Sequence, residues 1–288
     1  MTCINARSPD FFCIGAQRSG TSWLYHLLRE HPDVWLTPHK ELHYFDCLHL
    51  AEDHAAFFRK RRIDRLKFAI KQIGDSPSNS QLTSARWFSH FALAESVDDD
   101  WYKRLFSGCP SRCITGDITP AYAMLPVEGF AHMKRLAPSA KILFIMRNPV
   151  DRVWSQIRFH AKFFNNPKLL EPEAAIDFAD SLECVARTRY DMTLDAVEKV
   201  FPAKRVLTVF FEDLHSVDAG NQALAKVLTF LDLVPRPQQS SPPTKLAAPP
   251  AAIPDVLLRH LETKYAEMKV NLEKRFGRLP ENWCKKPI

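Results

Sequence analysis

A short turn near the start of the chain has the composition of an anion-binding loop. The apolar run Phe11–Ile14 predicts a strand, and the segment 15–23, with the sequence GAQRSGTSW, follows it at once. A tight turn between a strand and a helix leaves backbone N–H groups pointing outward, and the helix dipole adds to their attraction for phosphate. The glycines have the spacing of a phosphate-binding loop (P-loop), but Thr21 and Ser22 stand where a nucleotide-hydrolysing loop has Lys-Ser or Lys-Thr. The cation of this segment is Arg18, inside the turn.

A second candidate anion site follows another apolar run, Lys141–Met146. Arg147 comes directly after this predicted strand, and Pro149 suits the first turn of a helix. Ser155 then lies about two turns into that helix, at a rise of about 1.5 Å per residue. An arginine and a serine placed in this way can hold one anion between them. The same residues also fit a simpler arrangement, in which Arg147 pairs with a carboxylate and Ser155 faces solvent.

Both motifs belong to an alternation of short apolar strands and helical patterns. This alternation predicts an α/β fold with a central, mostly parallel sheet flanked by helices. Because such sheets bind ligands outside the carboxyl ends of their strands, we expect both motifs at that edge. A helical pattern over 253–276 predicts one long C-terminal helix that ends at Gly277. The predicted strands are Phe11–Ile14, Val34–Thr37, Cys113–Thr115, Lys141–Met146 and Arg205–Phe211.

Composition excludes several classes of protein. The chain has 288 residues, 46% of them hydrophobic, which argues against disorder and favours one domain over 1–288. No apolar run approaches the roughly 20 residues of a membrane-spanning helix, and Met1–Asp10 lacks the apolar middle part of a signal peptide. The seven cysteines form no CxxC pair, so we expect a cytoplasmic location without a disulfide framework or zinc site. A net charge of +6 suits a small anionic ligand better than nucleic acid.

Two segments have the character of insertions. Residues 50–105 contain a predicted basic helix over 55–73 and a predicted polar loop over 74–84. Residues 235–254 hold seven of the 21 prolines of the chain, which excludes a regular helix or a central strand there. Long irregular segments often form lids or substrate loops, so we expect both insertions at an acceptor site; a passive surface loop is the alternative.

Together, the two anion motifs resemble the paired signature of sulfotransferases that use 3′-phosphoadenosine 5′-phosphosulfate (PAPS). In that family a P-loop-like turn holds the 5′-phosphosulfate, and an arginine followed eight positions later by a serine holds the 3′-phosphate. The resemblance implies a three-layer P-loop-like fold, PAPS as co-substrate and no metal. Trp23 takes the position at which cytosolic members stack a ring on adenine, although a core tryptophan also fits. The donor-binding residues that the resemblance implies are Gln17, Arg18, Ser19, Gly20, Thr21, Ser22, Trp23, Arg147, Ser155 and Tyr190.

The segment 40–46, KELHYFD, resembles an element of carbohydrate sulfotransferases of the heparan-sulfate type, in which the glutamate is the base. An acceptor hydroxyl is a poor nucleophile until its proton is removed, so the reaction needs such a group. The resemblance implies Glu41 as general base and Arg18 and His43 as further catalytic residues. His43 and Asp46 would orient the acceptor or tune Glu41. A solvated acidic loop is the alternative.

The chain departs from the family pattern at two positions. Arg18 stands where the family usually has a catalytic lysine; arginine stays charged, so we expect it to stabilise charge on the leaving oxygen of an in-line transfer. Ile118 stands where a lysine often lies in the segment 116–122, GDITPAY, which weakens the inference of a heparan-like acceptor. Thr119 and Tyr122 of this segment either line the acceptor cleft or only pack.

The sequence therefore predicts transfer of a sulfuryl group from PAPS to a hydroxyl of a carbohydrate, lipid or other small alcohol. Two other functions remain open. A P-loop kinase or nucleotide hydrolase needs a lysine after Gly20, which is absent, and a magnesium-binding aspartate at a strand end, for which Asp117 is a candidate. A non-catalytic relative would only bind the nucleotide, or would bind a partner through the basic residues 59–71.

Overall fold

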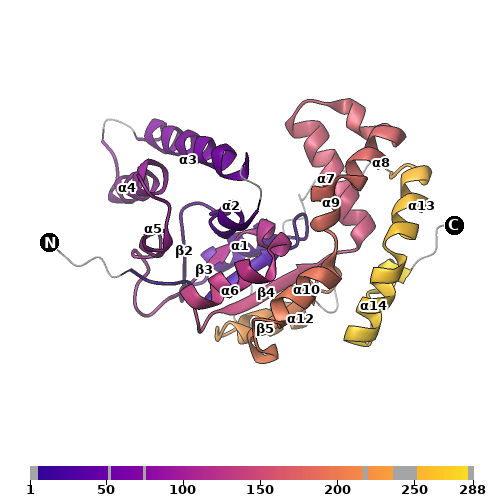
Figure 1. The fold of residues 1–288 in the computed structure, drawn as a ribbon. Coiled ribbons are helices and arrows are strands. Elements are labelled where there is room, and N and C mark those ends of the chain that lie inside the picture. Colours follow the sequence, from indigo (N-terminus) through magenta and orange to yellow (C-terminus); the bar gives the residue numbers. More distant parts are fainter. Residues whose placement is uncertain (1–5, 51–52, 74–75, 217–219, 236–251, 285–288) are drawn as a thin grey trace.

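Five parallel strands form the centre of the molecule (Figure 1), in the order β2-β3-β1-β4-β5. The computed structural model describes residues 6–50, 53–73, 76–216, 220–235 and 252–284, so most of the predicted proline-rich insertion lies outside the described residues. Every neighbouring pair of strands is parallel, which confirms the predicted α/β class. The strands are β1 (Phe11–Gly15), β2 (Val34–Leu36), β3 (Ile114–Ile118), β4 (Lys141–Met146) and β5 (Val206–Phe210).

Helices of very different lengths connect and flank these strands. None of the described helices is both long and apolar enough to cross a membrane. The α-helices are α1 (Thr21–Arg29), α2 (Phe45–His49), α3 (Asp53–Lys71), α4 (Asn79–Leu93), α5 (Asp99–Arg104), α6 (Val127–Leu136), α7 (Pro149–Phe163), α8 (Pro172–Asp180), α9 (Leu182–Ala186), α10 (Tyr190–Glu198), α11 (Phe211–Leu214), α12 (Gly220–Phe230), α13 (Asp255–Lys264), α14 (Ala266–Phe276) and α15 (Glu281–Cys284). The 3₁₀ helices are η1 (Pro120–Met124), η2 (Pro167–Leu170) and η3 (Ala203–Arg205).

The strands alternate between two apolar cores, one on each face of the sheet. Along β4, Ile142, Phe144 and Met146 belong to one core, whereas Leu143 and Ile145 belong to the other. Helices α6, α7 and α10 contribute to the first core, and helices α1 and α12 contribute to the second. This three-layer arrangement follows from the two-residue period of a strand whose two faces are both buried.

The predicted strands are all present, with one marked difference in extent. β4 has the predicted bounds, whereas β3 continues to Ile118, beyond the predicted Cys113–Thr115. An aspartate inside a buried strand disfavours such an extension, because its charge must be removed from water. Here Asp117 accepts three hydrogen bonds from side-chain hydroxyls, so the strand continues through it.

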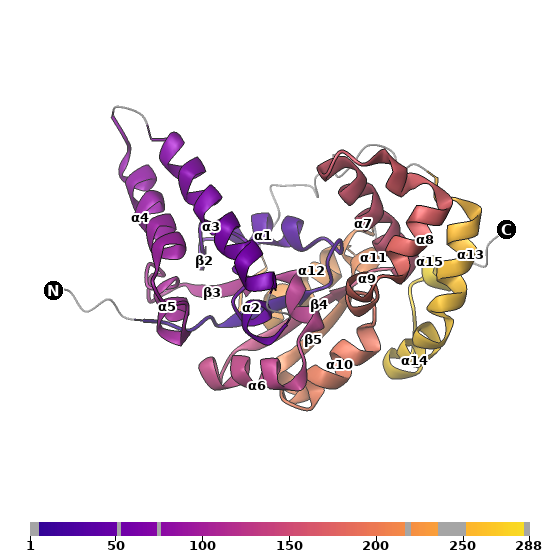
Figure 2. The same cartoon turned by 45° about the horizontal axis from the view of Figure 1, so that its top comes forward.

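The basic helix expected at 55–73 is α3, but the polar loop expected at 74–84 ends earlier. α4 begins at Asn79, where Ser78 and Gln81 form a reciprocal capping box. The spacing S-x-x-Q is the sequence signal of such a cap, so the helix start was readable from the sequence. Helices α3 and α4 pack side by side and stand out from the sheet, at the end of the molecule opposite α13 and α14 (Figures 1 and 2).

The prediction of one C-terminal helix over 253–276 was wrong. The chain forms two helices, α13 and α14, which meet at Tyr265. Helix α13 buries Leu261 and contacts α7 and α8, whereas α14 buries Leu272 and contacts α10. Because the chain breaks at Tyr265, each helix buries its own apolar side against different neighbouring helices. The predicted end at Gly277 is confirmed, since this glycine adopts the left-handed conformation that closes many helices, with a φ of 72°.

Gly116 of β3 lies directly opposite Phe11 of β1 in the sheet, and a Cβ atom at position 116 would approach the Phe11 ring to 2.2 Å. We therefore expect Gly116→Ala to lower the free energy of unfolding by about 1–3 kcal/mol through overpacking. Adding Phe11→Leu should restore part of this loss, as measured by urea unfolding. If the two losses simply added, the steric explanation would be wrong.

Candidate active site

The turn between β1 and α1 leaves polar groups available for an anion. Gly20 adopts a φ of 82° just before α1, and the N–H groups of the first helical turn have no carbonyl partner within the helix. Ser19 is fully buried and its hydroxyl has no hydrogen-bond partner among the described residues; the same holds for the amide oxygen of Gln17. An unpartnered buried polar group costs about 1–3 kcal/mol, which a phosphate bound by the Ser19 hydroxyl would remove.

Arg18 joins the two predicted anion motifs. Its backbone carbonyl accepts a hydrogen bond from Nη1 of Arg147 at 3.0 Å, and its Nε donates to Oγ of Ser155 at 3.1 Å. Its guanidinium lies over the ring of Phe159, 4.8 Å from the ring centre. Since the Ser155 hydroxyl accepts from Arg18, its own proton is left to donate to a ligand. The two motifs therefore meet at one edge of the sheet.

Several arginines concentrate positive charge at this edge. Burial lowers the pKa of Arg18, and the charges of Arg147, Arg158 and Arg152 lower it further. Burial is also the main cause that lowers the pKa of Arg147. The Nε atoms of Arg147 and Arg158 are buried without a hydrogen-bond partner among the described residues. A ligand with several negative charges would relieve this repulsion and supply the missing acceptors.

Arg147 is held in place from three directions. The hydroxyl of Tyr190 donates to its carbonyl at 2.9 Å, and its guanidinium lies 4.7 Å from the centre of the Phe211 ring. The next residue, Asn148, donates its backbone N–H to the carboxylate of Glu212 at 2.8 Å. Tyr190 is fully buried behind Arg147, so in this position it orients Arg147. A contact between Tyr190 and the donor stays a prediction.

Trp23 lies largely within the core beneath the turn. Only 6% of its surface is exposed, and its ring centre is 5.1 Å from that of His215, which stacks on Phe211. Most of the ring is therefore committed to packing, and its contact with adenine stays a prediction. Of its two predicted neighbours in the loop, Thr21 is buried and Ser22 is exposed.

The three catalytic candidates share an unusual backbone conformation. Arg18 and Glu41 both have a φ of 67°, and His43 has a φ of 53°. Residues other than glycine rarely adopt positive φ, and each such position costs about 1–3 kcal/mol unless its surroundings support it. Positions of this kind cluster at functional sites. Sequence reasoning gave no indication of this strain, because a residue type other than glycine does not by itself predict a positive φ.

Asp117 is a fully buried acceptor in β3. Its carboxylate accepts hydrogen bonds from the hydroxyls of Thr119 at 2.6 Å, Tyr122 at 2.8 Å and Tyr102 at 2.8 Å. Burial raises the pKa of Asp117, and these three hydrogen bonds oppose the rise. Both carboxylate oxygens are committed to hydroxyls, so Asp117 is not placed as the magnesium ligand that a P-loop kinase would need.

The hydroxyls around Asp117 also hold the loop that carries Glu41 and His43. Oγ1 of Thr119 accepts from the backbone N–H of Leu42 at 3.0 Å, and the hydroxyl of Tyr122 accepts from the backbone N–H of Tyr44 at 3.2 Å. Both residues are fully buried and pack, rather than line a cleft. The backbone is thus tied to the sheet on either side of His43, which offsets the strain of the loop.

Glu41 lies in a short chain of charged groups. Nζ of Lys40 is 2.5 Å from its Oε1 and Nε2 of His43 is 3.6 Å from its Oε2, while Nδ1 of His43 is 2.6 Å from Oδ2 of Asp46. Burial opposes ionisation of Glu41, but the hydrogen bond with His43 and the charge of Lys40 outweigh it and hold the pKa of Glu41 well below its usual range. Burial alone would lower the pKa of His43, yet Asp46 and Glu41 raise it overall. Both shifts favour the charged forms, a carboxylate at Glu41 and an imidazolium at His43.

Glu41 also acts on the anion-binding turn, since its charge raises the pKa of Arg18 against the other influences. The predicted base and the predicted phosphate site are thus within electrostatic reach of one another. Arg158 and Arg152 were missed by sequence reasoning. Arg158 was findable, because it lies three residues after Ser155 and therefore on the same face of the helix.

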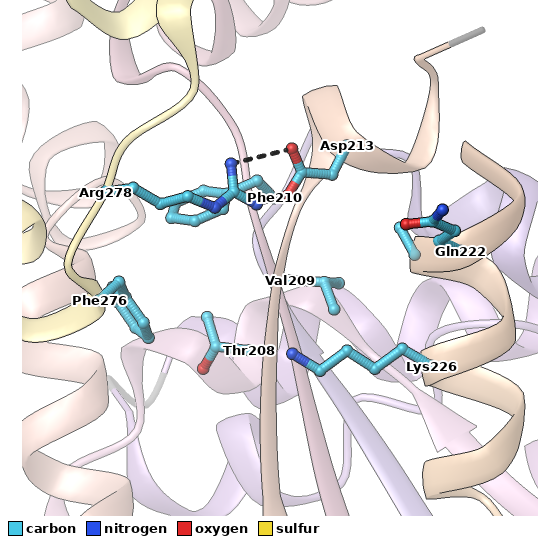
Figure 3. A pocket seen from close by; sticks show the side chains of 9 residues that line it. Thr208, Val209, Phe210, Asp213, Gln222, Lys226, Phe276 and Arg278 are labelled. Carbon is cyan, nitrogen blue, oxygen red and sulfur yellow. Dashed lines mark hydrogen bonds and ion pairs between the residues drawn. The ribbon is translucent and has the colours of Figure 1, made fainter. Parts of the chain in front are cut away.

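A separate cavity of about 450 Å³ opens beside the edge strand β5 (Figure 3). Lys226 of α12 and Arg278, which follows α14, extend into this region, and Arg278 pairs with Asp213. None of the residues predicted from the sequence to bind the donor or the acceptor lines this cavity. Among the described residues, no group of three or more His, Cys, Asp or Glu side chains could hold a metal ion.

Comparison with solved structures agrees with the observed fold. The chain is similar to a sulfotransferase structure from Alicyclobacillus acidocaldarius, with 24% identity and a TM-score of 0.62 over 96% of this chain and 99% of that one. It is also similar to the sulfotransferase domain of the olefin synthase of Synechococcus PCC 7002, with 17% identity and a TM-score of 0.52 over 90% and 96% of the two chains. These likenesses show the fold. No curated protein matches the sequence.

The sequence itself matches a family model. The model of the sulfotransferase family covers residues 9–236, which include the turn after β1, the KELHYFD segment and the arginine after β4. This match spans well over half of the chain. The protein belongs to the sulfotransferase family.

Proposed function

We propose that the protein transfers the sulfuryl group of PAPS to a hydroxyl of an acceptor, within one domain and in the cytoplasm. The observation that carries the proposal is the link at Arg18, which brings Arg147, Ser155 and the turn after β1 to one place. A doubly phosphorylated adenosine needs two anion sites at a short separation. Two charges on opposite faces of the molecule could not serve one nucleotide.

The turn and the helix α7 would hold the donor at its two ends. The buried hydroxyl of Ser19 and the N–H groups that open α1 fit the 5′-phosphosulfate, since they are donors without partners in the protein. Arg147 and the remaining hydroxyl proton of Ser155 fit the 3′-phosphate. The bound donor supplies the sulfuryl group, and the residues of this chain orient it.

Glu41 is the base in this proposal. Its carboxylate takes the proton of the acceptor hydroxyl as the bond from the acceptor oxygen to sulfur forms and the bond from sulfur to the phosphate oxygen breaks. Arg18 stabilises the negative charge that grows on the leaving phosphate. His43 acts on Glu41 and does not receive the proton, since it already carries its own between two carboxylates.

The kinase alternative is less well supported. The loop has no lysine after Gly20, and the carboxylate of Asp117 is committed to three hydroxyls. A non-catalytic relative would keep the phosphate site but would have no need of an ionised glutamate on a strained loop beside it. The acceptor in this proposal is a carbohydrate, a lipid or another small alcohol.

The donor site is tested by ligand-induced stabilisation, because a ligand that binds the native state raises its melting temperature. Adenosine 3′,5′-bisphosphate should stabilise the protein, and Arg147→Ala should weaken its binding by roughly 10- to 150-fold, the value of about 1.5–3 kcal/mol for hydrogen bonds to a charged group. Arg147→Ala should weaken the binding of adenosine 5′-phosphosulfate only slightly, because this nucleotide lacks the 3′-phosphate. Arg135→Ala, an exposed arginine of α6, is the matched control. Stabilisation by ATP–magnesium alone would support the kinase alternative.

The role of Glu41 is tested with Glu41→Gln, which keeps the shape of the side chain and removes the base. We expect kcat to fall by about 10²–10⁴-fold, the usual contribution of a positioned base. The affinity for adenosine 3′,5′-bisphosphate should stay the same, as should both quantities in Glu30→Gln, an exposed control at the end of α1. A parallel loss of turnover and affinity would make Glu41 a structural residue; unchanged activity would refute it as the base.

The tuning role of His43 is tested by pH dependence. The native enzyme should show no acid limb near neutral pH, because the pKa of Glu41 is held low. His43→Asn removes the hydrogen bond and positive charge that lower this pKa, so the acid limb of kcat/KM should move to higher pH; asparagine also tolerates the positive φ. Profiles of both proteins from about pH 3 to pH 9 measure the shift, because the acid limb starts from below the ordinary pKa of a glutamate. An acid limb at the same pH in both would contradict this role.

A further inference from the structure

Helix α3 carries an exposed stripe of two arginines between two phenylalanines. Phe57, Arg61, Arg65 and Phe68 follow one another at intervals of four, four and three residues, which places them on one side of the helix. The two phenylalanines are 51% and 61% exposed, and both arginines are exposed. The guanidinium of Arg61 lies 5.4 Å from the centre of the Phe57 ring. We call these four residues the Phe-Arg stripe.

A different side of α3 attaches the helix to the domain. Phe58, Arg62 and Leu66 are at most 9% exposed, and the guanidinium of Arg62 lies 5.2 Å from the centre of the Trp101 ring. The core therefore packs against one cation of this helix, Arg62, whereas the Phe-Arg stripe stays in solvent. Contact of a phenylalanine ring with water is unfavourable, and burial of the ring would lower the free energy. Two exposed phenylalanines on a basic helix therefore indicate a surface that something else covers.

The point of attachment is the loop of the proposed base. The ring of Phe58 stacks on that of His43, with 3.6 Å between the ring centres and 20° between the planes. Figure 2 shows the same relation at the level of the fold, because one end of α3 lies against α2, the helix that follows this loop. The stripe begins one residue before Phe58, so it leads away from the active site along α3.

Electrostatic effects place the arginines of the stripe near the same loop. His39 lies two residues before Glu41, and burial followed by the charge of Arg65 lowers its pKa to about 4, with Arg61 adding to the effect. The charge of Glu41 acts on the same imidazole in the opposite sense. The side chain of His39 is thus within electrostatic reach of Glu41 and of both arginines.

The charge of the chain is concentrated in this helix. Residues 59–71 contain seven cations and one acid, Asp64, so this segment alone has an excess of six positive charges. The net charge of the whole chain is also +6, so the remaining residues balance. Asp64 lies 4.0 Å from Lys67, and neither Arg61 nor Arg65 is assigned an acidic partner among the described residues. The stripe is therefore a local attractor for anions.

We propose that the Phe-Arg stripe binds the acceptor, and that this acceptor is an extended molecule with carboxylate or sulfate groups away from the hydroxyl that reacts. The proposal rests on the function proposed above and adds the acceptor class. The stripe runs from Phe57 to Phe68, or about 16 Å of helix, which exceeds the length of a single small alcohol. Arg61 and Arg65 would hold two acidic groups in their planar forks, and Phe57 and Phe68 would pack on apolar faces of the acceptor on either side of them.

The test compares two charge reversals on the same helix. Arg61→Glu/Arg65→Glu alters the stripe, and Arg59→Glu/Lys67→Glu makes the same change of charge at exposed positions on other sides of α3. The probe is an oligosaccharide with a glucuronate in every second ring, and its counterpart has the carboxylates reduced to alcohols. Binding is measured by calorimetry with adenosine 3′,5′-bisphosphate present.

We expect the native protein to bind the acidic probe at least tenfold more tightly than the reduced one. Arg61→Glu/Arg65→Glu should abolish this preference, and Arg59→Glu/Lys67→Glu should retain most of it. Equal binding of both probes, or equal losses in both variants, would overturn the proposal. So would binding of the stripe to vesicles of phosphatidylglycerol without binding of the acidic probe, since that result indicates a lipid surface.

The melting temperature with adenosine 3′,5′-bisphosphate separates this proposal from the one on which it rests. Arg61→Glu/Arg65→Glu should be stabilised by this ligand as much as the native protein, because the stripe lies outside the donor site. A native protein that binds the acidic probe but gains no stability from the bisphosphate would refute the donor site and leave the stripe. A native protein that is stabilised by the bisphosphate but does not prefer the acidic probe would refute the role of the stripe and leave the donor site.

Discussion

The contact on which the site depends is the one between Arg147 and the carbonyl of Arg18. A guanidinium that donates to a backbone carbonyl of the opposite loop fixes the distance between two turns that follow different strands. The same loop residue reaches Ser155 with its side chain, so a single residue sets the spacing of both anion sites. Because Arg18 makes both contacts, a change in either turn would alter the other.

Asp117 holds the loop of the proposed base in place, as the contact between Arg147 and Arg18 holds the proposed donor site. A buried carboxylate is unfavourable by itself, and it is tolerated here because three hydroxyls satisfy it. Two of those hydroxyls pass the constraint on to the backbone beside His43. The strained loop is thus anchored in the sheet, and the position of Glu41 depends on a residue that takes no part in the chemistry.

The chain uses positive charge in two physically different ways. The arginines around Arg18 are partly or wholly buried, so their repulsion is strong, and the multiply charged nucleotide that we propose as donor would relieve it. The cations of α3 are exposed, so each contributes less, and selection among acceptors comes from their number and spacing. The buried arginines around Arg18 suit a donor of one fixed structure. The exposed cations of α3 suit an acceptor that is recognised along its length.

The sequence determined those features that depend on neighbours in the chain. The five strands, the glycine turn, the arginine after β4 and the end of α14 at Gly277 follow from local apolar patterns and backbone preferences, so they were predicted near their observed places. The capping box at Ser78 belongs to the same class and could have been included. Even the juxtaposition of the two anion motifs follows, once a parallel sheet is assumed, because its strands end at a common edge.

Other features were decided only by tertiary contacts. The break at Tyr265 depends on which helices lie beneath the two halves, and the strand through Asp117 depends on hydroxyls that approach from other elements. The stack of Phe58 on His43 sets where the basic helix begins relative to the base. Local sequence carries no record of such partners, because hydrogen bonds and ring contacts between distant residues form only after the chain has packed. For that reason residue types could indicate the reaction, whereas the placement of the groups that tune it required the folded molecule.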